Sequence, residues 1–178
     1  MNLTTMNVVE ELRMKTVFLI TFVSLCCFVC GASANTFEYK DVSDFPLLHE
    51  FSSIEDFENF YGDYTQSCLD NSYGGSRGIP CFISYEMWDR ELNYYYQRLA
   101  SVLDKEGRTA LKESQKAWLK ERDLSIEFNT LLLNNKYSER PGTMFLLMRA
   151  GDAEDLSYDM VKQRALQLKK WLAFCSKD

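Results

Sequence analysis

The sequence predicts an all-α fold: an antiparallel helical hairpin plus a third long helix, in a three- to four-helix bundle, with a short N-terminal helix and an extended acidic arm. Apolar residues recur every three or four positions through long stretches without Gly or Pro, the pattern of helices with one buried face. No stretch shows the alternation typical of a β-strand. The 178 residues suffice for one domain with its own core.

The first elements of the predicted fold are short. Residues 35–50 show no helical period and are expected to form the extended arm. The next residues read Ser-Ser-Ile-Glu at positions 52–55, a capping-box pattern that predicts the start of a short helix. Residues 70–80 are rich in Gly, Ser and Asn and predict a loop. The apolar stripe of the short helix is expected to be Ile54, Phe57, Tyr61 and Tyr64.

Three long helices account for the rest of the chain. The hairpin is expected over residues 82–103 and 109–133, with a break at Gly107. A third helix is expected over residues 152–174, after a loop and a helical turn at residues 144–148. Its inward side chains are expected to be Leu156, Met160, Leu168, Trp171 and either Phe174 or Cys175.

The N-terminus has the pattern of a secretory signal peptide. An apolar run at residues 17–29 follows Lys15 and precedes the small residues Ala32 and Ala34. The run is shorter than a bilayer span, so we expect export with cleavage after Ala34 and no membrane span. Two acidic residues near the start favour a later start of translation, at Met14. The alternative is lipid attachment at one of three cysteines: Cys26, Cys27 and Cys30.

Removal of residues 1–34 leaves 144 residues and three cysteines. An exported protein can hold disulfides, and an odd number of cysteines leaves one thiol free or paired with another chain. Cys68 and Cys81 flank the predicted loop and are the favoured pair. Cys175, at the end of the last helix, is then free or links two chains. The alternative is that Cys175 pairs with one of the other two.

Charge and composition exclude several classes of protein. The net charge is −6 and the isoelectric point about 4.9, which argues against a nucleic-acid partner. The single histidine, His49, excludes any site built on two imidazoles. No nucleophile–base spacing, phosphate-binding loop or metal-ligand cluster is present in the sequence. We therefore expect no enzymatic activity, no metal and no cofactor.

The acidity is concentrated in the N-terminal half of the chain. Residues 35–75 hold nine acidic residues and one basic residue, a net charge of −8, whereas residues 76–178 carry +2. This distribution either keeps the protein soluble or forms an attachment surface for a cationic partner. The candidate partner-binding residues are Glu55, Asp56, Glu58, Asp63 and Asp70.

Two polar patterns lie inside the predicted hairpin. Their three- and four-residue spacing puts the polar side chains beside the apolar stripe of each helix, so these side chains are expected to meet between the helices. Asp89 is the expected partner of Arg122, because an unpaired buried charge is costly. These residues either hold the hairpin in register or serve a function. The patterns are Asp89-x-x-Leu92-Asn93-x-x-Tyr96 and Gln115-x-x-Trp118-x-x-x-Arg122-Asp123.

Together with Cys68, Cys81 and a late Arg164-x-x-x-Leu168, these patterns resemble the LprI-type lysozyme-inhibitor domain family. The resemblance covers about residues 68–171 and implies a small exported helical domain of bacteria. Two cysteines frequent in that family are missing, since Ser125 stands at one place and the start of the last helix holds none. The expected parts are a signal peptide at 1–34, an acidic arm with a short helix at 35–67, and an LprI-like helical domain at 68–175.

The resemblance and the acidic segment together predict a secreted or periplasmic binding protein that inhibits lysozyme. Its partner would be a cationic lysozyme, approached by the carboxylates of the acidic segment. The alternative is an envelope structural or protein-interaction module without lysozyme activity, with Cys175 as a possible link in a disulfide-bonded dimer.

Overall fold

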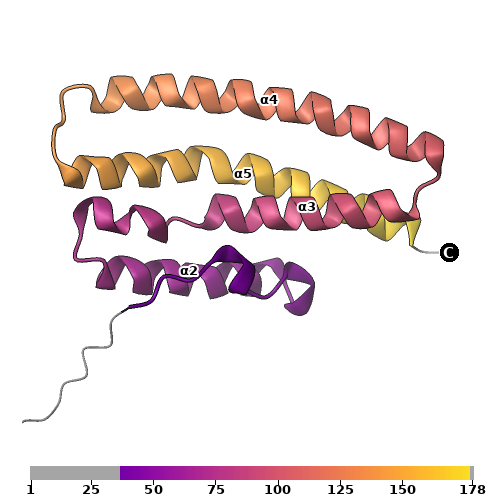
Figure 1. The fold of residues 1–178 in the computed structure, drawn as a ribbon, viewed down its shortest axis with the longest axis horizontal. Coiled ribbons are helices and arrows are strands. Elements are labelled where there is room, and N and C mark those ends of the chain that lie inside the picture. The colour runs from indigo at the N-terminus through magenta and orange to yellow at the C-terminus, as the bar shows by residue number, and fades with distance from the viewer. Residues whose placement is uncertain (1–36, 177–178) are drawn as a thin grey trace, which may run out of the picture. The chain divides into compact units, whose positions relative to one another are not determined.

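The computed structural model describes residues 37–176, and the signal peptide expected at residues 1–34 lies outside them. This part of the chain is helical and contains no strand, which confirms the all-α fold class (Figure 1). No helix in it is long and apolar enough to span a membrane. In order, the elements are η1 (Val42–Asp44), η2 (Leu48–Glu50), α2 (Ile54–Asn71), η3 (Gly75–Cys81), α3 (Ser84–Val102), α4 (Lys105–Tyr137) and α5 (Thr143–Cys175).

The C-terminal helix α5 lies between α3 and α4. It packs against α3 on one side and α4 on the other, so the consecutive helices α3 and α4 contact each other little (Figure 1). The expected hairpin is therefore open, and α5 occupies the space between its two helices. Val161, Ala165 and Leu168 of α5 are fully buried, at the spacing of one helical face.

Helix α3 carries the centre of the core. Trp88, Leu92 and Leu99 are buried at the expected spacing, and each such side chain contributes about 1.5–3 kcal/mol. Phe57 of α2 places its ring 5.3 Å from that of Trp88, centroid to centroid. Trp88 Nε1 also donates a hydrogen bond to the Tyr61 hydroxyl at 3.1 Å. One tryptophan therefore joins α2 to α3 by both packing and hydrogen bonding.

The inward face of α5 differs from the expected one. Leu156, Trp171 and Phe174 are exposed, and Leu168 alone of the expected set is fully buried. The physical reason is that α5 has a helix on each of two sides. The face that packs on both neighbours includes a charged side chain, Arg164, which a search for apolar positions passes over.

The helix boundaries also differ from those expected. α2 is not short: it has 18 residues, and its N-cap is Ser53, whose hydroxyl accepts from the Asp56 N–H at 3.0 Å. α4 continues to Tyr137, which is buried and whose hydroxyl donates to Asp152 of α5 at 2.7 Å. The apolar run at residues 144–148 belongs to the start of α5 and is not a separate turn. Contacts with neighbouring helices extend these elements beyond their apolar stripes.

The sequence predicted an extended arm at residues 35–50, and the described part of this N-terminal segment packs against the helical bundle. Arg90 of α3 donates hydrogen bonds to the carbonyls of Phe45 and Pro46, at 2.7 and 2.8 Å, and to a third carbonyl in η1. Phe45 and Leu48 are buried in the common core. The segment is therefore anchored to the helical bundle by both polar and apolar contacts.

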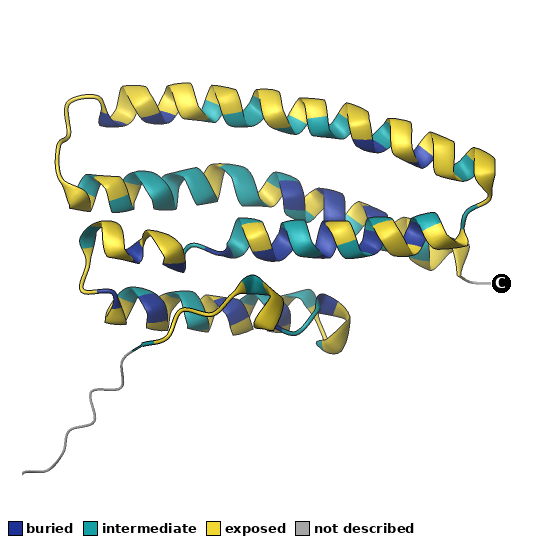
Figure 2. Ribbon diagram, viewed as in Figure 1, coloured by how far each residue is buried: buried dark blue, intermediate teal, exposed yellow. Residues whose placement is uncertain are grey.

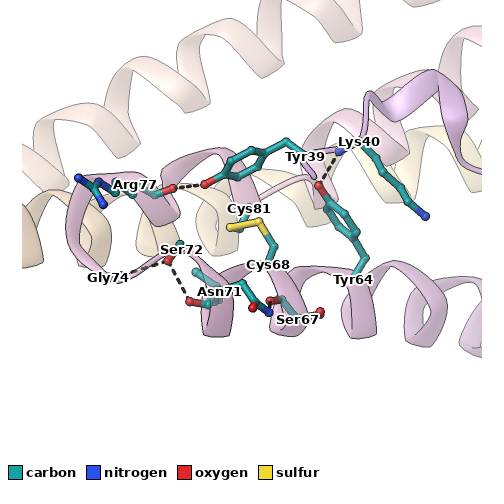
Figure 3. The surroundings of a disulfide bond; sticks show 11 residues. Tyr39, Lys40, Tyr64, Ser67, Cys68, Asn71, Ser72, Gly74, Arg77 and Cys81 are labelled. Carbon is teal, nitrogen blue, oxygen red and sulfur yellow. Dashed lines mark hydrogen bonds between the residues drawn. A yellow bond between two sulfur atoms is a disulfide. The ribbon is translucent and has the colours of Figure 1, made fainter. Parts of the chain in front are cut away.

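A disulfide joins Cys68 of α2 to Cys81 of η3, as the sequence predicts, and both cysteines are fully buried (Figure 3). The N-terminal segment bonds to both elements that the disulfide connects. The Tyr39 hydroxyl donates to a carbonyl of η3 at 3.0 Å, and the Lys40 N–H donates to the Tyr64 hydroxyl of α2 at 2.9 Å. The disulfide and these bonds fix the N-terminal segment, α2 and η3 as one unit.

Replacement of both Cys68 and Cys81 by Ala should lower the free energy of unfolding by about 3 kcal/mol, because the link closes a loop and restricts the unfolded chain. Urea unfolding followed by circular dichroism measures this change. Cys175→Ala is the matched control and should unfold like the wild type, because Cys175 is exposed and unpaired. An unchanged midpoint in the double variant would contradict the prediction.

Candidate functional site

Gln115 and Arg164 form a polar contact at the seam between α4 and α5. Arg164 Nε donates to Gln115 Oε1 at 3.0 Å, and Arg164 is only 6% exposed and Gln115 9%. Nη1 of the same arginine donates to Gln167 Oε1 at 2.6 Å, and Nη2 donates to the Ser114 hydroxyl at 3.1 Å. All three acceptors are neutral, so this buried guanidinium is hydrogen-bonded without a carboxylate partner.

Two tryptophans flank the same guanidinium. The central carbon of Arg164 lies 5.9 Å from the ring centroid of Trp118 and 5.3 Å from that of Trp171, which is the range of cation–π attraction. Burial lowers the pKa of Arg164 from its ordinary value, although an arginine remains protonated at neutral pH. The seam therefore holds a cation between two aromatic rings.

The sequence predicted that Arg122 pairs with Asp89. In the structure Arg122 pairs instead with its neighbour in the sequence, Asp123. Arg122 Nε and Nη2 donate to Asp123 Oδ1 at 2.9 and 2.7 Å, and the guanidinium lies 5.6 Å from the Trp118 ring centroid. Burial lowers the pKa of Arg122, but the bond to Asp123 and the charges of Tyr85 and Asp89 raise it overall. Asp89 therefore acts on the pKa of Arg122 through its charge, and the two form no ion pair within 4 Å.

The polar pattern of α3 is divided between the surface and the core. Asn93 Nδ2 donates to the carboxylate of Asp89 at 3.0 Å and to its carbonyl at 2.9 Å, so these polar side chains bond within one helix. Leu92 is buried, and Tyr96 packs against the core from a half-buried position. The polar side chains of α3 and α4 do not all meet as expected. The contact that forms between helices joins Gln115 of α4 to Arg164 of α5. That these residues hold the helices in register stays a prediction.

Helix α3 also holds a buried acidic side chain that the sequence patterns did not predict. Glu91 is fully buried, and its Oε1 accepts from Arg90 Nη2 at 3.2 Å. Burial raises the pKa of Glu91, and hydrogen bonds from the Leu48 backbone and from Arg90 offset this only in part. The position of Glu91 in the sequence could have indicated its burial. Glu91 stands three residues after Trp88 and directly before Leu92, on the apolar face of the helix.

The candidate partner-binding residues lie on α2, and four of the five are exposed. The exception is Glu58, which is half-buried and pairs with Lys162 of α5 at 2.7 Å. Asp56, Asp63 and Asp70 follow one another at seven-residue intervals, or about two helical turns, so they form a row along the outer side of the helix. Since α2 contains no basic residue, no lysine or arginine of its own neutralises this row.

The remaining candidates for chemistry are isolated. His49 is exposed, and its ring stacks on that of Tyr94 at 5.2 Å between centroids. Within residues 37–176, no three acidic, cysteine or histidine side chains gather in a group that could hold a metal ion. The features left for function are therefore the seam around Arg164 and the acidic row of α2.

These features define a class of protein: a disulfide-linked all-α domain whose two longest helices meet at a buried glutamine–arginine contact. Residues 81–168 match the family model described as Lysozyme inhibitor LprI. This match confirms the resemblance to the LprI family that the sequence patterns predict. The match includes α3, α4 and most of α5 but leaves out α2 with its acidic row. No curated protein and no solved structure matches the chain.

Glu91→Gln should change how stability depends on pH. The pKa of Glu91 is raised in the folded state, so the stability contributed by its protonated form is present below about pH 4.5 and is lost as pH rises through the folded-state pKa. The unfolding free energy of the variant minus that of the wild type should therefore increase above pH 4.5, by at most about 1.4 kcal/mol per pH unit.

Urea unfolding at several pH values measures this difference. Glu127→Gln, which changes an exposed glutamate on α4, is the matched control and should show no such trend. A difference between Glu91→Gln and the wild type that stays constant with pH would contradict the prediction, because it would mean that folding does not raise the pKa of Glu91.

Proposed function

We propose that this protein is an exported inhibitor of lysozyme that attaches to a cationic lysozyme through the outer side of α2. The observation that carries the proposal is the LprI family match over residues 81–168. The N-terminal pattern supports export, because an apolar run and small residues precede the proposed cleavage after Ala34. On this proposal the protein acts in the periplasm or outside the cell, and it is a binding protein without enzymatic activity.

The charge of α2 supports the proposed attachment surface. Asp56, Asp63 and Asp70 span 14 residues, which is about 21 Å of helix at 1.5 Å per residue. A row of this length and sign attracts a cationic surface from solution, and it raises the association rate more than it adds final affinity. Phe60, 45% exposed on the same helix, adds apolar surface for contact.

The mode of inhibition follows from how lysozymes work. Such enzymes cleave glycans with two carboxyl groups that flank the scissile bond. A helix laid across the binding groove excludes the glycan, and no reaction of the inhibitor itself is needed. Glu58 is less available for this contact because it already pairs with Lys162, so we assign it to holding α2 on the bundle.

Loss of the acidic row should weaken inhibition about tenfold or more, because each interfacial charge contributes on the order of 0.5–1 kcal/mol. The test variant is Asp56→Asn with Asp63→Asn and Asp70→Asn. The measurement is a turbidity assay in which purified mature protein is titrated against several types of lysozyme, at low and high salt. Inhibition by the wild type should also weaken as salt rises.

The matched control changes net charge equally on other exposed surfaces, with Glu127→Gln, Glu139→Gln and Asp155→Asn, and should inhibit like the wild type. An equal loss in both triple variants would mean that total charge matters and the row on α2 does not. No inhibition by the wild type at micromolar excess, against any lysozyme tested, would reject the proposal.

A second candidate function, a protein-interaction module that pairs with a second copy, is favoured by the C-terminal end of α5. Cys175 is exposed and unpaired among the described residues, and the disulfide between the other two excludes the alternative pairing within the chain. Cys175 borders an apolar cleft of about 320 Å³, beside Phe174, which is 80% exposed. An exposed thiol beside apolar surface suits an intermolecular disulfide in an oxidising compartment.

Purified mature protein should therefore show a dimer on a non-reducing gel that disappears with reductant and is absent from Cys175→Ser. Size-exclusion chromatography of the same samples separates a true dimer from aggregates. A wild-type protein that remains monomeric after oxidation would reject this second function and leave lysozyme inhibition to its own test.

A further inference from the structure

An open cleft of about 630 Å³ lies at the seam between α4 and α5, where Arg164 is held. Both tryptophans that flank the guanidinium line the cleft, and so does Lys170. Glu121 is the acidic residue among the lining side chains, and it forms no ion pair with Arg164 within 4 Å. The volume falls in the range of small-molecule sites, which is about 300–1,000 Å³.

The hydrogen bonds of Arg164 leave part of its guanidinium unused. An arginine has five N–H groups, and here one from Nε and one from each terminal nitrogen are donated to neutral side chains. One N–H on each of Nη1 and Nη2 therefore has no acceptor among the described residues. Two N–H groups on neighbouring nitrogens are what a carboxylate accepts in a two-bond pair.

The charge of Arg164 is also uncompensated. The residue is 6% exposed, and no carboxylate of the described chain lies within 4 Å of its nitrogens. A buried charge without a counter-charge is unfavourable, and an anion that enters the cleft would relieve that cost. By contrast, the terminal nitrogens of the half-buried Arg90 already bond to three backbone carbonyls and to Glu91.

We propose that the cleft between α4 and α5 binds a small organic carboxylate. The carboxylate pairs with the free N–H groups of Arg164, and the apolar or ring portion of the ligand lies against Trp118 and Trp171. Lys170 adds a second positive charge at the same cleft. The proposal does not rest on lysozyme inhibition, because the acidic row proposed for that activity is on α2 and has no part in this cleft.

The tryptophans make the test direct. Two of the three tryptophans of the chain line the cleft, so their fluorescence reports on a ligand there, whereas Trp88 is fully buried. Benzoate is the probe, because it joins a carboxylate to a flat ring. Benzamide is the matched neutral ligand. Benzoate should bind the full-length mature protein with a Kd on the order of 1 mM, and benzamide should bind at least about tenfold more weakly.

Variants assign the binding to the cleft. Arg164→Gln should weaken benzoate binding at least about tenfold, whereas Arg98→Gln, at an exposed arginine on α3, should leave it unchanged. Trp171→Leu, at the more exposed of the two rings, should weaken it severalfold and keep the fold intact. If Arg164→Gln fails to fold, the Trp171→Leu variant and the comparison of benzoate with benzamide decide whether the cleft binds a carboxylate. Equal binding of benzoate and benzamide, no binding of benzoate up to about 50 mM, or full binding by Trp171→Leu would overturn the proposal.

Discussion

The packing of α5 between α3 and α4 is the constraint on which the rest of the structure depends. The fully buried face of α5 sits on α3, whose Trp88 in turn holds α2 through Phe57 and Tyr61. The other side of α5 contacts α4. Helix α4 is exposed over most of its length (Figure 2). A helix in this position must present two faces, and the second face of α5 is where Arg164 and its cleft lie.

Arg90 of α3 and Arg164 of α5 differ in the partners of their guanidinium groups. Arg90 is half-buried, and its two terminal nitrogens bond to three carbonyls of the N-terminal segment and to Glu91, whereas its Nε has no partner among the described residues. Arg164 meets neutral side chains and two aromatic rings, and it faces a cleft. Because burial of a charge must be offset, the first arrangement stabilises a chain segment and the second leaves capacity for an external anion.

The surfaces that could carry function are distributed unevenly over the chain. The family match covers α3, α4 and most of α5, and thus includes the seam of Gln115 and Arg164. The acidic row is on α2, outside the match, and is attached to the bundle through the Cys68–Cys81 disulfide and the Glu58–Lys162 pair. An acidic surface and a cleft that holds a buried arginine therefore occur in one disulfide-linked domain.

The sequence by itself determined the helical class and the stripe of Trp88, Leu92 and Leu99, and it favoured the pairing of Cys68 with Cys81 over a pairing with Cys175. Local spacing suffices for the first two features, and the turn-rich loop between the cysteines favours the third. Only the tertiary structure decided that α5 lies between α3 and α4, and that Arg122 pairs with Asp123 instead of Asp89. Helical periodicity shows which side of a helix is apolar but not which helix it will meet. The packing of the whole core determines which helices become neighbours, and the partners of long polar side chains depend on these neighbours.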